Sequence, residues 1–195
     1  MNVIVLDLTS DQHFITLQFN QHRYEFSFNE ESLIKKNDWE KKIVTIKESV
    51  PGFDFKKIDK MAYAAGPGSY TGARLAYTFM QTLELILGKQ FYAFSNLRAL
   101  NFANPKKISV IKGNKNDFYY RSAGKDYYCD SLTNLPEGDF IGFKSDFLPL
   151  EGVQEFERGV ISKNILDMVL ESDNHHLKTN YPNYIKELSY QKINE

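Results

Sequence analysis

The sequence predicts an α/β protein in which mixed sheets carry flanking helices. Its first 28 residues hold one short apolar run and two runs that alternate with period two, which is the pattern of β-strands. Helical and strand-like periods then alternate along the rest of the first half. In addition, the turn Gly66-Pro67-Gly68 joins a strand-like run directly to a helix-like run.

Three antiparallel strands are expected first, at residues 3–8, 13–19 and 24–28. The next segment, Glu30 to Ser49, has charged residues with interspersed Leu, Ile and Val, which indicates an amphipathic helix. Pro51-Gly52 follows and marks the end of this helix.

A strand of small and aromatic residues is expected at 61–65, immediately before the glycine-rich turn. Ser69 or Thr71 can cap the next helix, which continues to Leu87. Gly88 then occupies the position where a left-handed residue ends a helix. A strand at 90–94 and a helix capped by Ser95 complete the first half.

The second half is punctuated by glycine and proline and has weaker patterns. Strands are expected at 107–111, 118–123, 126–129 and 140–143. A last helix is predicted from the spacing of Ile161, Ile165, Met168 and Val169. The sequence contains no repeat that we can detect.

Composition excludes several classes of protein. The chain has 24 Lys and Arg against 25 Asp and Glu, and this balance gives no general field that would attract nucleic acid. The single cysteine, Cys129, excludes an internal disulfide framework, and no Cys and His cluster suggests a metal. The N-terminal run is broken by Asp7, so neither a signal peptide nor a membrane anchor is expected, and a cytoplasmic location is predicted.

The stretch Gly66 to Arg74, GPGSYTGAR, is the most informative motif. Its glycines allow a close backbone approach, and the free amides of a helix start favour an anion. The alternative to anion binding is that the glycines only tighten the turn between the strand and the helix. The motif is neither a phosphate loop nor a dinucleotide fingerprint. The candidate anion-binding residues are Gly66, Gly68, Ser69, Thr71, Gly72 and Arg74. For Arg74, a structural ion pair is favoured over a ligand contact.

This motif resembles the GPGSFTGxR signature of the TsaB (YeaZ) family. The similarity extends over most of the first half, including the opening strand with Asp7 and Thr9, and the run Phe94 to Leu97. In the second half, only Asn183-Tyr184-Ile185-Lys186 is similar to the closing Tyr-Leu-Arg of the family, with lysine in place of arginine.

The resemblance implies an actin-like ATPase fold built from two ribonuclease-H-like lobes, here residues 1–103 and a smaller, divergent lobe of residues 104–195. It also implies a role without catalysis and without a cofactor. Family members pair with the transferase TsaD, which carries threonylcarbamoyl to the tRNA adenosine next to the anticodon, and the ATPase TsaE joins them. A homodimer is expected for the protein alone, with tRNA contacted only indirectly.

Two departures from the family pattern bear on chemistry. Lys112-Gly113-Asn114 stands where many members have Asp-Ala-Arg, so a base replaces an acid. No histidine pair resembling the metal ligands of the catalytic relatives precedes the motif, and no metal site is expected. A residual nucleotide hydrolase that uses Asp7, or a glycoprotease-like hydrolase that uses Ser69, is the alternative function, although Ser69 lacks the GxSxG elbow.

The helix from Thr71 to Leu87 is apolar nearly all round, which predicts that it is covered on nearly all sides. Its own sheet can cover one side, and a partner chain or a neighbouring helix must cover the other. Complete burial within the chain is the alternative. The residues expected at a partner interface are Leu33, Tyr77, Met80, Gln81 and Glu84.

Overall fold

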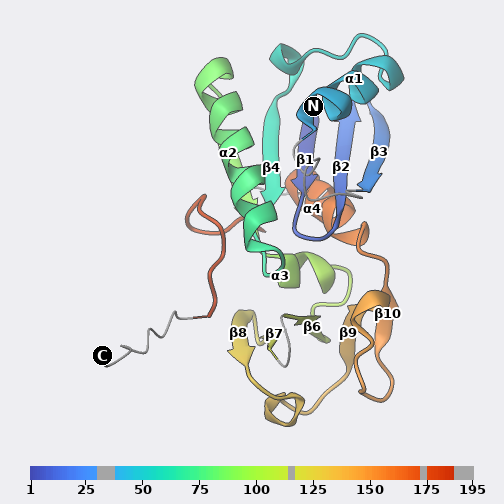
Figure 1. The fold of residues 1–195 in the computed structure, drawn as a ribbon, viewed down its shortest axis with the longest axis vertical. Coiled ribbons are helices and arrows are strands. Elements are labelled where there is room, and N and C mark those ends of the chain that lie inside the picture. The colour runs from blue at the N-terminus through green and yellow to red at the C-terminus, as the bar shows by residue number, and fades with distance from the viewer. Residues whose placement is uncertain (30–37, 114–116, 172–174, 187–195) are drawn as a thin grey trace, which may run out of the picture.

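The structure, a computed structural model, describes residues 1–29, 38–113, 117–171 and 175–186. Within these residues the chain forms two five-stranded mixed sheets, which lie one above the other in Figure 1. Helices flank the upper sheet on both faces. The α/β architecture predicted from the sequence is confirmed.

The first sheet has the strand order β3-β2-β1-β4-β5. Its first three strands form an antiparallel meander, and β4 and β5 run parallel to β1. All five strands were expected from the sequence. Their bounds are β1 Val3–Asp7, β2 Gln12–Phe19, β3 His22–Asn29, β4 Lys60–Ala64 and β5 Phe91–Phe94.

Alternation along the central strands gives this sheet two buried faces. On β1, Ile4 and Leu6 point into a core shared with helices α1 and α2. Val3 and Val5 point into a second core shared with helices α3 and α4. Because side chains of a strand alternate between faces, both faces of a strand this apolar must be covered.

Helix α2 (Tyr70–Leu87) begins and ends where the sequence predicted. The Ser69 hydroxyl accepts a hydrogen bond from the Gly72 amide, and Gly88 adopts the left-handed conformation after the last turn. Helix α1 (Trp39–Ser49) packs beside it, with Trp39 stacked on Phe79 at a centroid distance of 3.7 Å. The first part of the predicted helix, residues 30–37, lies outside the described residues.

The second sheet has the order β10-β9-β6-β7-β8. Strands β6, β7 and β8 form an antiparallel meander, and β9 and β10 run parallel to β6. The second sheet therefore repeats the topology of the first, although no repeat is detectable in the sequence. The bounds are β6 Ile108–Lys112, β7 Phe118–Ser122, β8 Lys125–Cys129, β9 Phe140–Phe143 and β10 Gln154–Phe156. Strand β10 was not predicted, because three residues are too few for a periodic pattern.

Helices α3 (Asn96–Leu100) and α4 (Val160–Glu171) join the two sheets. Helix α3 packs against β6 and β7, while α4 returns to the first sheet and packs against β1, β2 and β4. The core therefore runs from Val5 in the first sheet through Leu166 in α4 to Ile111 in the second sheet.

Residues 175–186 return across both sheets, and we call this segment the strap. The Leu177 amide donates to the carbonyl of Ala93 on the edge strand β5, and the Asn183 amide donates to the carbonyl of Ala65. Figure 1 shows the strap beside α2, on the side away from α1. None of the helices in the described ranges combines the length and the apolar character that a membrane span requires.

At Gly72, the backbone of helix α2 lies very close to Leu8, the residue that follows β1. A Cβ at this position would lie 1.7 Å from the Leu8 carbonyl oxygen, which belongs to backbone and cannot rotate away. We predict that Gly72→Ala lowers the free energy of unfolding by at least about 2 kcal/mol, because α2 must move off the β1–β2 turn. Chemical denaturation measures the change. The neighbouring exposed variant Thr71→Ala should stay within about 0.5 kcal/mol, and equal stability of both variants would contradict the close approach.

Candidate functional site

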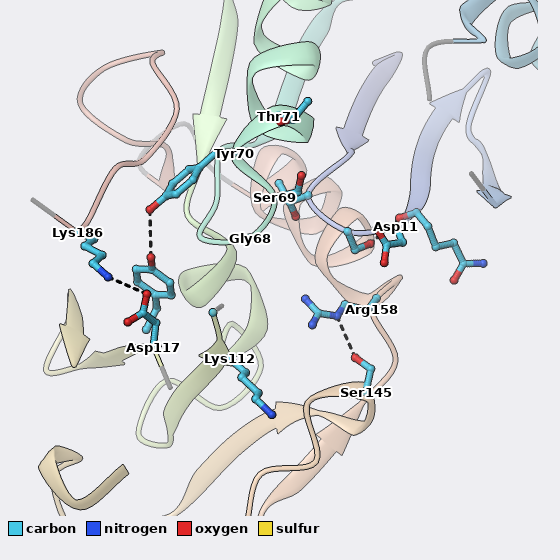
Figure 2. Close-up of a pocket in the computed structure, with 15 residues that line it drawn as sticks. Asp11, Gly68, Ser69, Tyr70, Thr71, Lys112, Asp117, Ser145, Arg158 and Lys186 are labelled. Atoms are coloured by element: carbon cyan, nitrogen blue, oxygen red, sulfur yellow. Dashed lines mark hydrogen bonds and ion pairs between the residues drawn. The ribbon is translucent and has the colours of Figure 1, made fainter. Parts of the chain in front are cut away.

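A cleft of about 970 Å³ lies between the two sheets at the start of α2. Its walls come from the β1–β2 turn, the glycine-rich turn, the β6–β7 turn, the segments on either side of β10, and the strap (Figure 2). The lining residues are Thr9, Ser10, Asp11, Gln12, Gly68, Ser69, Tyr70, Thr71, Lys112, Gly113, Asp117, Tyr119, Ser145, Arg158 and Lys186.

The glycine-rich turn is fixed against the β1–β2 turn by backbone contacts. The Ser69 amide donates to the Thr9 carbonyl at 2.8 Å. A Cβ on Gly68 would lie 2.6 Å from the same carbonyl oxygen, so only glycine allows this approach. The glycines therefore tighten the turn, as the sequence alternative proposed, and the same turn forms one wall of the cleft.

Buried polar side chains behind the turn form a continuous network. The Asp7 carboxylate accepts hydrogen bonds from the amide and the hydroxyl of Thr9, at 2.9 and 2.6 Å. The Asn96 amide group donates to the Thr9 hydroxyl and to the carbonyl of Pro67, and its oxygen accepts from the Gly66 amide. Asp7, Thr9 and Asn96 are each at most 4% exposed, so this network supports the turn from inside the protein.

Burial raises the pKa of Asp7 above its ordinary value of 3.8, since desolvation outweighs the hydrogen bonds from Thr9 and the nearby charge of Arg158. The sequence left open a residual nucleotide hydrolase that uses Asp7. In this chain, the same carboxylate is engaged by Thr9 and lies behind the wall of the cleft, as a capping acid would.

Two of the three cations in the cleft are paired with acids. Lys186 donates to Asp117 at 2.8 Å, and Arg158 pairs with Asp146 and donates to Ser145. Lys112 projects into the cleft, and the described residues supply no ion-pair partner for its ammonium group (Figure 2). The cleft can therefore offer one uncompensated lysine and the amide groups at the start of α2 to an anion.

The structure brings only part of the predicted anion-binding set to the cleft. Gly68, Ser69 and Thr71 line it. Gly66 and Gly72 lie behind it, and both are buried by their neighbours. These two residues shape the turn and do not line the cleft, so their contribution to an anion would be indirect.

Arg74 lies on the outer side of α2 and does not line the cleft. Its Nε donates to the Tyr184 hydroxyl at 2.9 Å, and its guanidinium lies over the Tyr184 ring. The structural ion pair expected for Arg74 is absent from the described residues, because the strap brings a tyrosine to this position where the sequence suggested an acid. The hydrogen bond with Tyr184 raises the pKa of Arg74.

The predicted partner residues on α2 divide between two environments. Met80 is fully buried in the core of the first sheet, so its placement on the outer face is corrected: the helix turns this position toward Ala76 and Leu83. Gln81 is exposed, whereas Tyr77 and Glu84 are half-buried. Leu33 lies outside the described residues.

The outer face of α2 is a single exposed stripe, which we call the α2 face. Its members recur at helical spacing, and they are mainly polar in the first half of the helix and apolar near its end. They are Thr71, Arg74, Thr78, Gln81, Thr82, Leu85 and Ile86. A helix predicted to be covered nearly all round therefore leaves one stripe uncovered.

Neither a metal cluster nor an activated serine is formed by the described residues. No cluster of three or more His, Cys, Asp or Glu side chains that could hold a metal occurs in ranges 1–29, 38–113, 117–171 and 175–186. The Ser69 hydroxyl is engaged as the N-cap of α2, and no hydrogen bond from histidine or carboxylate to this hydroxyl is found among the described residues.

The duplicated sheets, their shared helices and the cleft between them define a two-lobed protein with the actin-like ATPase fold. Comparison with known proteins agrees. The model of the family described as "TsaD: tRNA N6-adenosine threonylcarbamoyltransferase" matches residues 45–139, from α1 through the 3₁₀ turn after β8. A search of the curated proteins returned no match.

Solved structures with the same fold are known. The chain is similar to YeaZ from Pseudomonas aeruginosa, with a TM-score of 0.69, 14% identity, and coverage of 94% of this chain and 99% of that chain. It is also similar to an uncharacterised protein from the same organism with similarity to peptidase YeaZ, with a TM-score of 0.71, 14% identity and coverage of 95% and 99%. The chain therefore shares the fold of these two YeaZ-related structures.

Several cleft residues were not predicted. Asp11, Asp117, Ser145 and Arg158 come from turns that are far apart in the sequence. The β1–β2 and β6–β7 turns occupy the same position in the two repeated sheets, and only this repetition places both at the cleft. Recognition of the repeat would have predicted Asp11 and Asp117, but the second half of the sequence resembles the first too little to reveal it.

The raised pKa of Asp7 predicts a pH dependence of stability. Because the folded protein holds this proton more tightly than the unfolded chain, the contribution of Asp7 favours folding below pH 3.8 and is lost as the pH rises through the raised pKa. The Asp7→Asn variant has no charge to desolvate, so it should not lose stability as the pH rises. The side-chain oxygen of the new asparagine can still accept the hydrogen bonds from Thr9. We expect equal or higher stability at neutral pH, by on the order of 1 kcal/mol, and a flatter profile from pH 4 to 7. Urea denaturation across this range measures it, and an unchanged slope would contradict it.

Proposed function

We propose that this protein is a non-catalytic, activating subunit in the threonylcarbamoylation of the tRNA adenosine next to the anticodon. In this role it binds a TsaD-like transferase, a TsaE-like ATPase joins the complex, and tRNA is contacted through the partner. The protein forms a homodimer when alone. The TsaD-family match and the YeaZ-like fold support a TsaB-like role in tRNA modification.

The exposed α2 face is the observation that carries the proposal. Leu85 is 86% exposed and Ile86 is 68% exposed, although the opposite side of the same helix is packed against the sheet. Val44 on the neighbouring α1 is also exposed. Such side chains on adjacent helices favour a partner, because burying them removes apolar area from water.

The state of the cleft argues against independent catalysis. Lys186 and Arg158 are each paired with an acid, and Asp7 is held by Thr9 behind the wall. A nucleotide hydrolase needs cations and a metal-binding carboxylate that face its phosphates. A serine hydrolase needs a base that activates its nucleophile, whereas the Ser69 hydroxyl accepts from the Gly72 amide. These contacts favour a scaffold over the hydrolase alternative.

A partner-dependent assay tests the proposal. Threonylcarbamoyl transfer to tRNA by a TsaD-like enzyme of the same organism should rise when this protein is added, together with a complex on size exclusion. We predict that Thr78→Arg, in the middle of the α2 face, lowers both stimulation and affinity at least about tenfold, because it places a long charged side chain in the contact. Titration calorimetry measures the affinity.

Thr133→Arg is the matched control, because Thr133 is also exposed but lies in the 3₁₀ turn that follows β8 and not on α2. This variant should bind and stimulate as the wild type does. Asp7→Asn should also retain stimulation. Loss of ATP or peptide hydrolysis by the protein alone in Asp7→Asn or Ser69→Ala would instead establish the hydrolase function.

A further inference from the structure

Exposed aromatic side chains gather where the strap crosses the first turns of α2. Tyr70 is 38% exposed, Tyr181 is 65% exposed and Tyr184 is 49% exposed. Together with Tyr77 and Arg74 they form what we call the tyrosine patch. Tyr77 packs against the core of the first sheet, and the Tyr70 hydroxyl contacts the Tyr119 hydroxyl of the second sheet, but much of the patch remains exposed.

The strap is held firmly at this place. The Asn183 amide donates to the Ala65 carbonyl, and the Tyr63 hydroxyl donates to the Asn180 carbonyl at 2.7 Å. Further along, Lys186 binds Asp117, which precedes β7 of the second sheet, and lies over the Tyr128 ring of β8. The backbone that carries Tyr181 and Tyr184 is therefore fixed to both sheets.

The tyrosine rings are also fixed against α2. Tyr181 packs on Tyr77 with a centroid distance of 5.6 Å, and Tyr184 packs on Tyr70 at 5.4 Å. The hydrogen bond between Arg74 and Tyr184 adds a further restraint. Side chains that are ordered before binding lose little conformational entropy when a partner covers them. Tyrosine and arginine are also the residue types enriched at the centres of protein interfaces.

Arg74 indicates the charge of the partner. It is exposed, and the described residues provide it with no carboxylate. Its Nε is engaged by Tyr184, but its terminal nitrogens make no described hydrogen bond to the chain. A guanidinium with two free terminal nitrogens matches a carboxylate in bidentate geometry.

The area of the α2 face is too small for a stable interface by itself, which is a further reason to extend the interface beyond this helix. An 18-residue helix is about 27 Å long and about 10 Å wide, so one face has a footprint of roughly 300 Å². A stable interface needs roughly 800 Å² from each partner. The α2 face must therefore be joined by neighbouring surface, and the tyrosine patch is continuous with it through Arg74.

From these contacts, and resting on the proposed function, we infer that the tyrosine patch is part of the surface that binds the partner subunit. The strap supplies Tyr181 and Tyr184 to this surface. The partner places aliphatic side chains on the tyrosine rings and an Asp or Glu carboxylate against Arg74.

Charge reversal tests the carboxylate. We predict that Arg74→Glu weakens binding to the TsaD-like subunit about 10- to 100-fold, and that Tyr184→Ala weakens it about tenfold. Tyr184→Phe keeps the ring but loses the hydroxyl that orients Arg74, and should weaken binding only about two- to fivefold. Titration calorimetry measures all three. An Asp→Arg or Glu→Arg substitution in the partner should restore binding to Arg74→Glu specifically.

Tyr127→Ala and Lys125→Glu are matched controls, because both residues are exposed on β8, away from α2, and should leave affinity unchanged. Thermal unfolding establishes that each variant folds. If the wild type binds no TsaD-like subunit, the proposed function fails, and this inference fails with it. If the wild type and the tyrosine-patch variants bind equally well, the inference alone is overturned. Loss of self-association with an unchanged heterocomplex would assign the patch to a second copy and overturn the choice of partner.

Discussion

The contact between the β1–β2 turn and the start of α2 is the constraint on which the rest of the structure depends. The Thr9 carbonyl accepts from the Ser69 amide, while its hydroxyl donates to Asp7 and accepts from Asn96. Because these groups are buried, each must be satisfied within the protein. The network fixes where α2 leaves the first sheet, and so determines both the wall of the cleft and the direction of the α2 face.

The two sheets share one architecture but serve different purposes. The first is covered on both faces and supports α2, whereas the second supplies the opposite wall of the cleft. Helix α4 and the strap connect the two sheets. Helix α4 contributes to the core that they share, and the strap makes hydrogen bonds with the first sheet and an ion pair with Asp117 beside the second. Asp126 adds to this connection by accepting from Ser95 and Asn183.

The cleft and the outer surface carry their charges differently. In the cleft, most charged groups are paired within the chain, so a polyanion would have to displace existing ion pairs. On the outer side of α2, the guanidinium group of Arg74 is engaged only by Tyr184 among the described residues, and the aliphatic side chains of Leu85 and Ile86 are exposed. The unsatisfied surface therefore lies on α2 and not in the cleft, and this contrast is the physical basis for proposing a binding subunit.

The sequence by itself determined the strands of the first sheet, the caps of α2 and the glycine-rich turn, because period, capping residues and glycine act locally. Tertiary structure decided the rest. The repeated topology of the second sheet, the burial of Met80 and the meeting of Arg74 with Tyr184 depend on segments far apart in the chain. In a helix apolar on most sides, as α2 is, composition cannot say which side faces the sheet. That choice follows from the direction in which the Gly66 to Gly72 turn sends the helix, and from the return of the strap.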